Sequence, residues 1–366
     1  MSPSRSVAAL LIPALVLVAA CGSDDASPAT SAPASTTPAA STTIAEATTT
    51  DAPDTTAAAT STTAAAPPST TASSFPVTIT NRLGEATIPA KPQRIVALGY
   101  NDVDVVYGLG LKPVGAAANT VTGGLSPWLE GKYSADGVEF LNALPQLSIE
   151  AVAALHPDVI LASPFATIDD TYAQLSAIAP VVADTNGVLT DTWQERTRKI
   201  GVALGMPEEA EALVERGEAD LAAVAERFPG LEGKTYTLSW ARSADQVVMM
   251  AADDITSQMF GELGLTIPEP VLAMHTQAAG AGAGGATVTM ETIGQLDADL
   301  MVVAFNSDGD RATFESNPVF AAVPAIADGR YQAVDIATIG AFRAPTVFSI
   351  GWGFGQLEPL FAKVTS

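Results

Sequence analysis

Two stretches of the chain repeat one pattern of apolar and polar positions. Residues 148–155 predict a short helix with a serine cap, which leads through a turn ending in Asp to the unbroken apolar run 159–162. At a constant offset, residues 289–296 predict a threonine-capped helix, a turn ending in Asp and the apolar run 300–303. Unbroken apolar runs predict strands buried on both faces, as in parallel sheets. The repetition indicates two homologous α/β lobes, with chance reuse of a common phrase as the alternative.

A looser pair of segments supports the same interpretation. The apolar run 95–98 precedes a predicted helix at 102–109, and the run 247–250 precedes a predicted helix at 256–263. Both helices end in a Leu-Gly-Leu phrase. We therefore expect the second strand and helix to be the counterparts of the first.

A helical segment separates the two copies. Residues 191–204 predict one helix, and residues 208–228 place apolar side chains on one face with the period of an amphipathic helix. Pro229 and Gly230 end this second helix. A single long connecting helix leaves a cleft between the lobes and makes a stiffer hinge than several loose strands would.

The predicted fold class is therefore α/β, with two α/β lobes joined by a single long helix. The expected boundaries are 75–187 for the N-terminal lobe, 188–230 for the connecting helical segment and 231–366 for the C-terminal lobe. Two lobes of this length are each large enough to bury a core of their own.

The chain before residue 75 has a different composition. Residues 7–20 are apolar but too short to span a bilayer, which needs about 20 apolar residues, so residues 1–21 predict an export signal. Small residues precede Cys21 in a pattern that resembles the lipobox of bacterial lipoproteins, so we expect Cys21 to be lipidated. The alternative is an ordinary cleavage site beside a cysteine. Residues 22–74 are almost entirely Ser, Thr, Ala and Pro, which predicts a disordered tether.

Charge and composition exclude several classes of function. The formal net charge is −23, from 40 acidic and 17 basic residues, so the chain repels phosphate backbones and anionic lipid. We therefore expect no nucleic-acid partner. One cysteine excludes a disulfide framework and a thiolate metal cluster, and two histidines, His156 and His275, argue against a histidine-rich site, so no metal site is expected.

An ordered set of phrases in the folded part resembles the iron-siderophore binding proteins of ABC importers, a family that also includes haem and cobalamin receptors. The phrases lie at residues 89–98, 101–104, 109–115, 145–150, 157–160, 317–320, 324–325 and 328–330. The resemblance implies two lobes joined by one long helix, capture of a ferric siderophore in the cleft and delivery to an ABC permease. It implies no cofactor, because the ligand carries the iron. It also fits a monomer anchored by lipid on the extracytoplasmic face of the cell membrane.

Large side chains that follow predicted strands are candidates for the ligand site, because open α/β sheets bind ligands beyond the carboxyl ends of their strands. The expected ligand-binding residues are Tyr100, Trp128, Trp240, Arg242 and Arg343. Arginine suits oxygen-rich ligands, and aromatic rings supply apolar contact and cation–π partners. The preferred three are Trp240, Arg242 and Arg343.

Other side chains in similar positions have alternative explanations. Phe165 and Phe342 also follow predicted strands, but core packing is equally expected for both. Arg311 follows the strand that begins at residue 300, where an ion pair with Asp308 or Asp310 would account for it.

The resemblance also implies that exposed carboxylates, one on each lobe, dock onto arginines of the permease. Asp104 lies at the matching place in the N-terminal lobe, where the family usually has Glu, and Asp254 is the candidate in the C-terminal lobe. The alternative for each is an ordinary carboxylate near a helix start, favoured by the helix dipole.

Other functions remain as alternatives. Haem binding would require an iron ligand such as Tyr100, Met274 or His275. A cell-envelope scaffold that kept the lobes and lost transport is a second alternative, and an enzyme is a third, although no catalytic residue can be assigned. The phrase at 280–285 matches Gly-x-Gly-x-x-Gly but lacks the flanking strand and helix of a nucleotide site, so it predicts a flexible loop.

Overall fold

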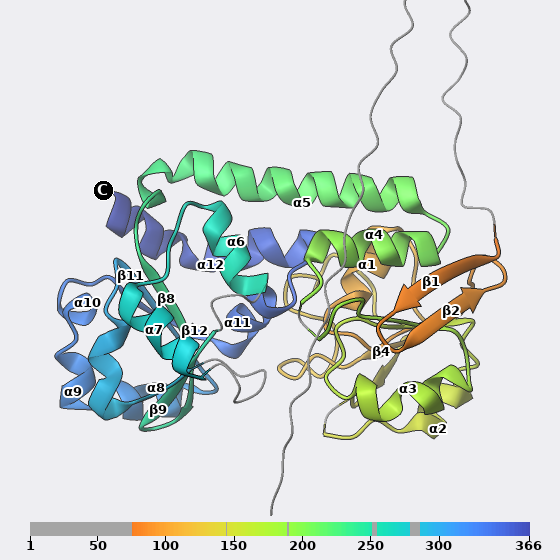
Figure 1. The fold of residues 1–366 in the computed structure, drawn as a ribbon, viewed down its shortest axis with the longest axis horizontal. Helices are drawn as coiled ribbons and strands as arrows, with labels where there is room; N and C mark the ends of the chain where they lie inside the picture. The colour runs from red at the N-terminus through yellow and green to blue at the C-terminus, as the bar shows by residue number, and fades with distance from the viewer. Residues whose placement is uncertain (1–74, 144, 189, 251–254, 279–285) are drawn as a thin grey trace, which may run out of the picture. The chain divides into compact units, whose positions relative to one another are not determined.

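Two five-stranded sheets flanked by helices form the folded part of the chain (Figure 1). The computed structural model describes residues 75–366 except 144, 189, 251–254 and 279–285. The expected signal and tether, the candidates Cys21 and Asp254, and the glycine-rich phrase 280–285 therefore lie outside the described residues. Chain contacts group the described residues into one compact unit. Within the described part of the chain, no helix combines the length and apolar character needed to cross a membrane.

The first sheet is entirely parallel, with strand order β5-β4-β3-β6-β7. Its strands are β3 (Ile95–Ala97), β4 (Gly115–Ala117), β5 (Glu139–Leu141), β6 (Val159–Ala162) and β7 (Val181–Ala183). The connecting helices are α1 (Asp102–Gly108), α2 (Ile149–Ala154) and α3 (Ile168–Ser176), and a hairpin of β1 (Val77–Asn81) and β2 (Gly84–Ile88) precedes them. Every residue of β6 is buried, as an unbroken apolar run in a parallel sheet predicts.

The second sheet is mixed, with strand order β10-β9-β8-β11-β12. Its strands are β8 (Tyr236–Ser243), β9 (Gln246–Met249), β10 (Thr287–Thr289), β11 (Leu300–Phe305) and β12 (Tyr331–Asp335). The short helices around it are η1 (Pro229–Leu231), α6 (Ile255–Glu262), α7 (Glu269–Ala278), η2 (Met290–Leu296), α8 (Asp308–Glu315), α9 (Pro318–Ala321) and α10 (Pro324–Ala327). Strands β8, β11 and β12 are parallel to one another, and β9 pairs antiparallel with both of its neighbours, β8 and β10.

The repeated sequence phrase corresponds to a repeated structure. In the first copy, Asp158 Oδ2 accepts hydrogen bonds from the backbone N–H groups of Gln93 and Arg94, at 2.8 and 2.9 Å, just before β3. In the second copy, Asp299 Oδ2 accepts from the N–H and hydroxyl of Thr235, at 2.8 and 3.0 Å, just before β8. Each Asp therefore ties the strand that follows it to the start of its parallel neighbour, which confirms the predicted duplication of the lobes.

The looser pairing of segments was wrong. The run at 247–250 falls in β9, which is antiparallel to β8, whereas β3 is a central parallel strand. The true counterpart of β3 is β8, because β3 pairs with β6 as β8 pairs with β11. An apolar run does not reveal strand direction, and a hairpin in the second lobe replaces the parallel crossovers of the first.

Three helices contribute to the cores of both lobes: α4 (Trp193–Ala203), α5 (Pro207–Arg227) and α12 (Val347–Thr365). The buried face of α5 is the predicted one, with Leu213 in the N-terminal core and Leu221 in the C-terminal core. Helix α5 packs against α4 and α12 (Figure 1). Gly217 permits the first contact, because a Cβ there would lie 2.5 Å from the Trp193 ring.

The C-terminal segment modifies the expected lobe boundaries. Helix α11 (Ile336–Arg343) and the start of α12 place Ala341, Val347 and Phe348 in the core of the N-terminal lobe. The segment 231–366 is therefore not confined to the second lobe. Since three helices link the two cores, only small relative movements of the lobes would preserve this packing.

Candidate functional site

A cavity of about 530 Å³ is lined by residues of both lobes. Its lining from the N-terminal lobe includes Tyr100, Asn101, Asn119, Ser126, Trp128 and Asn142, and the C-terminal lobe contributes Trp240, Ile336, Gly340 and Arg343. Tyr100 follows β3, and Trp240 lies late in β8, so the cavity lies at the carboxyl ends of central parallel strands, where open α/β sheets bind ligands.

Tyr100 and Arg343 bring one side chain from each lobe into this cavity. Burial raises the pKa of Tyr100, and the nearby charge of Arg343 acts in the opposite direction. Arg343 occupies the last turn of α11 and has no ion-pair partner among the described residues. A half-buried, unpaired guanidinium in a cavity is available to donate hydrogen bonds to ligand oxygens.

Trp240 and Arg242 form one unit at the cavity. The guanidinium carbon of Arg242 lies 3.8 Å from the Trp240 ring centroid, a cation–π contact. Trp240 Nε1 donates to Asn306 Oδ1 at 3.1 Å, which fixes the ring. Arg242 is exposed and does not itself line the cavity, so it lies beside the site and contacts it through the Trp240 ring.

Trp128 lines the cavity but is only 2% exposed. Its Nε1 donates to Asp104 Oδ2 at 2.6 Å, and its ring lies against Trp352 with centroids 5.4 Å apart. Trp128 therefore forms part of the cavity wall, held from behind, rather than an exposed ligand contact.

The structure contradicts the docking role expected for Asp104. The residue is 0% exposed, and its Oδ2 accepts from Trp128 Nε1 and from Thr346 Oγ1, both at 2.6 Å. A docking carboxylate must reach solvent, so Asp104 cannot serve this purpose. Its structural role is to connect the cavity wall of the first lobe to the residue that caps α12. Sequence reasoning missed this because both partners are distant in the chain.

Asp104 belongs to a buried charged cluster next to the cavity. Arg196 is 2% exposed and interacts electrostatically with Asp102, Asp104, Asp184 and Asp191, and its Nη2 donates to the Pro345 carbonyl. Asp102 Oδ2 accepts from Ser163 N at 3.0 Å, and Asp184 Oδ1 accepts from Ser163 Oγ at 2.8 Å. The cluster thus joins α1, the ends of β6 and β7, α4 and the segment before α12.

Burial raises the pKa of three carboxyls in this cluster. The pKa of Asp102 and that of Asp104 rise to about 7, and that of Asp184 rises to about 6, with the Arg196 charge acting in the opposite direction on each. One carboxylate oxygen of each residue has no hydrogen-bond partner within the described part of the chain. The cluster is therefore sensitive to pH near neutrality.

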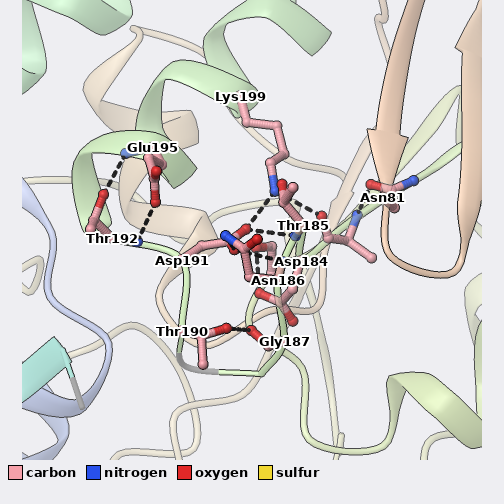
Figure 2. Close-up of polar contacts among 12 residues, drawn as sticks. Asn81, Asp184, Thr185, Asn186, Gly187, Thr190, Asp191, Thr192, Glu195 and Lys199 are labelled. Atoms are coloured by element: carbon pink, nitrogen blue, oxygen red, sulfur yellow. Dashed lines mark hydrogen bonds and ion pairs between the residues drawn. The ribbon is translucent and has the colours of Figure 1, made fainter. Parts of the chain in front are cut away.

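The loop between β7 and α4 is fixed by a second, partly exposed set of polar contacts (Figure 2). Asp191 Oδ2 accepts from Lys199 Nζ and Thr185 N, each at 2.7 Å, and its Oδ1 accepts from Asn186 N at 2.9 Å. Thr192 and Glu195 form a reciprocal capping box at the start of α4. These bonds set the position at which α4 leaves the first lobe, and hence the position of Arg196.

The remaining candidates lie away from ligand contact. Phe165 and Phe342 are 0% exposed and pack in the two cores, which settles their role as packing. Arg311 forms an ion pair with Glu315 at 2.9 Å, rather than with Asp308 or Asp310, and lines a separate cavity of about 430 Å³ in the second lobe. Met274 packs against the second lobe's core, and the His275 side chain lies outside the described residues.

Replacing Asp104 with asparagine is expected to flatten the pH dependence of stability. Burial raises the pKa of Asp104 to about 7, above the ordinary 3.8, so the folded protein binds this proton more tightly than the unfolded chain. The resulting penalty is present above about pH 7 and is relieved as pH falls toward 4. We expect the free energy of unfolding of the wild type to be higher at pH 5 than at pH 7.5, and we expect Asp104→Asn to reduce that difference by about 1–2 kcal/mol. Part of the difference should remain in the variant, because burial also raises the pKa of Asp102 and of Asp184.

The exposed Asp136 provides the matched control for this experiment. Asp136→Asn should retain the wild-type pH dependence, because Asp136 is exposed and lies outside the buried cluster. Equal pH profiles for the wild type and Asp104→Asn would show that Asp104 does not titrate in this range.

The described residues contain no group of three or more His, Cys, Asp or Glu side chains placed to hold a metal ion. The chemistry of the inter-lobe cavity is that of a binding site, with aromatic surfaces, neutral polar groups and one unpaired cation. A tyrosine, a tryptophan and a guanidinium converge there on the same space from two lobes.

Comparison with known proteins places this architecture in a family. The family model described as periplasmic binding protein matches residues 95–334. The putative ABC transporter substrate-binding lipoprotein YhfQ of Bacillus subtilis is 24% identical over 269 residues, which cover 71% of this chain and 81% of that protein. The Fe(3+) dicitrate-binding periplasmic protein FecB of Escherichia coli is 24% identical over 283 residues, covering 74% and 86%.

The solved structures share the fold. PiaA of Streptococcus pneumoniae, in complex with ferrichrome, superposes with a TM-score of 0.65 at 23% identity, covering 78% of this chain and 98% of that one. The match of the family model extends from the first strand of the first sheet into the last strand of the second, so it includes both lobes and their connecting helix. The chain belongs to the periplasmic binding protein family.

Proposed function

We propose that this protein captures a ferric siderophore outside the cytoplasmic membrane and delivers it to the permease of an ABC importer. The observation that carries the proposal is the inter-lobe cavity, in which Tyr100, Trp240 and the unpaired Arg343 face one space of about 530 Å³. Aromatic faces contact the apolar parts of a siderophore, and a guanidinium donates to the oxygens around its iron. FecB is named for ferric dicitrate and PiaA was solved with ferrichrome, which favours this ligand class.

In this proposal the ligand carries the iron, and the protein supplies neither a cofactor nor a chemical step. Binding is followed by a limited approach of the lobes, because α4, α5 and α12 connect their cores. The protein acts as a monomer held on the extracytoplasmic face of the membrane by lipid at Cys21, with residues 22–74 as its tether. A tether of this length reaches on the order of 40 Å, enough to place the lobes at a permease mouth.

Calorimetric titration of the full chain tests the proposal. The ligands are ferric siderophores of hydroxamate, catecholate and citrate type, their iron-free forms, haem and cobalamin. We expect saturable binding of at least one ferric siderophore with a Kd below about 1 μM. Trp240→Ala should weaken that binding by about tenfold or more, because a buried aromatic contact is lost.

Tyr172→Ala is the control for aromatic truncation, because Tyr172 packs at β2 and the first lobe's core, away from the cavity. Its affinity should equal that of the wild type. Saturation by haem or cobalamin alone would replace the siderophore with another cargo. A folded sample that binds none of these ligands would overturn the proposal and favour a scaffold role.

A further inference from the structure

We infer that the inter-lobe cavity selects ferric complexes without net negative charge, the tris-hydroxamate class, over anionic catecholate and citrate complexes. This inference rests on the proposed function, since it concerns the ligand of the same site. The relatives do not decide the class of siderophore, because FecB is named for a citrate complex and PiaA was solved with ferrichrome.

The cavity is poor in positive charge. Arg343 is the only charged side chain in the described lining of the cavity. Arg242 lies outside this lining and contacts the Trp240 ring. The parts of the lobes outside the described residues, at 144, 189, 251–254 and 279–285, contain neither Lys nor Arg, and their only charged residues are Asp253 and Asp254. These segments therefore add no positive charge to the site.

Buried carboxyls lie next to the cavity wall. The lining residues Asn101 and Val103 alternate along the chain with Asp102 and Asp104, which are both 0% exposed. Asp184 and Asp191 extend the same cluster, and the cations that act on these four carboxyls are Arg196, Lys199 and Arg82. Arg82 acts on Asp184 and is itself ion-paired with Asp169. The buried cluster thus contributes no excess of positive potential to a bound anion.

The neutral polar groups of the lining divide into two sets. Asn101 Nδ2 donates to the Ala344 carbonyl at 2.7 Å, and Asn119 Oδ1 accepts from the N–H groups of Val121 and Thr122, so both amides maintain the wall. Tyr100 and Asn142 have no side-chain hydrogen bond within the described part of the chain, so they can bind ligand oxygens as neutral groups. A site with neutral donors and one guanidinium suits a ligand whose charge is already balanced.

The three siderophore classes differ in the charge of their ferric complexes. Three hydroxamates carry one negative charge each and balance Fe³⁺, so a tris-hydroxamate complex is neutral unless its backbone adds charge. Three catecholates carry two negative charges each, so their complex with Fe³⁺ is a trianion. Ferric citrate complexes are also anionic. Moving such an anion from water into a cavity with one lining cation leaves charge without a partner, which disfavours binding.

Binding constants of the full chain for ferrichrome, ferric enterobactin and ferric citrate test the inference. We expect ferrichrome, a neutral tris-hydroxamate, to bind at least about 100-fold more tightly than the other two. Asn142→Arg adds a cation at an exposed lining position, and Asn142→Gln is the neutral control. The arginine variant should bind ferric enterobactin at least about fivefold more tightly than the glutamine variant, with a smaller change for ferrichrome.

The outcomes separate the two proposals. Tighter binding of ferric enterobactin or ferric citrate than of ferrichrome would overturn the inference and leave the proposed function intact. A preference for ferrichrome that Asn142→Arg leaves unchanged would show that shape, and not charge, discriminates, which also overturns it. If the folded chain binds no ferric siderophore, both proposals fail.

Discussion

Replacing Arg196 with methionine is expected to lower the free energy of unfolding by about 3–5 kcal/mol. Arg196 is 2% exposed and is the buried cation faced by Asp102, Asp104 and Asp184. Methionine retains much of the side-chain volume and removes the charge, so the carboxyls must either stay ionised without this partner or take up protons. Urea unfolding at about pH 7.5, followed by tryptophan fluorescence, measures the change.

Arg198→Met is the matched control, because Arg198 lies on the same helix and forms an exposed ion pair with Glu211. The Arg198 side chain is 45% exposed, so its loss should cost at most about 1 kcal/mol. Arg196→Met should also lose less stability relative to wild type near pH 5, where more of the carboxyls are protonated. Equal stability of the two variants at pH 7.5 would contradict the account of the buried cluster.

Arg343→Gln is expected to weaken binding of the ferric ligand by about 10- to 100-fold. The guanidinium is the only charged group in the described lining and has no ion-pair partner there, so the ligand oxygens are its natural partners. Glutamine keeps one neutral donor and leaves no buried group without a partner, so the free energy of unfolding should change by less than about 1 kcal/mol. Calorimetric titration and urea unfolding of the same sample separate the two effects.

Arg311→Gln controls for the loss of an arginine near a cavity, because Arg311 lines the other cavity and is paired with Glu315. Its affinity for the ferric ligand should equal that of the wild type. A loss of affinity in Arg311→Gln with none in Arg343→Gln would move the ligand site to the second lobe.

The parts of the fold that the sequence predicts correctly are those in which one local pattern decides the environment. The runs 159–162 and 300–303 are apolar at every position, and the strands β6 and β11 are buried at every position. The apolar face of residues 208–228 likewise predicts which side of α5 is buried, including Gly217 against Trp193. In each case the local pattern alone determines which positions are buried.

The missed features depend on contacts between distant segments. The run 247–250 has the composition of a parallel strand, yet it forms an antiparallel hairpin with β8, because pairing direction is set by the chain's path. Helix α12 contains three glycines and Pro359, a composition unfavourable for a helix, and it is stabilised by packing in both cores. The tertiary structure therefore determines both the pairing direction of β9 and the helical conformation of α12.

The site shows the same division. Tyr100, Trp240 and Arg343 could be chosen because each follows or lies late in an element whose end faces the cleft. The role of Asp104 could not be predicted, because an aspartate in the first turn of a helix has the same sequence signature whether it is exposed or buried. Only the fold brings Trp128, Thr346 and Arg196 around it.

Locating the iron tests the central claim most directly. Crystals of the full chain grown with its tightest-binding ferric complex, measured at the iron absorption edge, give the metal position from anomalous differences. The account predicts one iron between the lobes, with ligand oxygens within hydrogen-bond distance of Arg343 and ligand atoms against Tyr100 and Trp240. Iron in the cavity lined by Asn306, Asp335 and Gln356, or elsewhere on the surface, would contradict it.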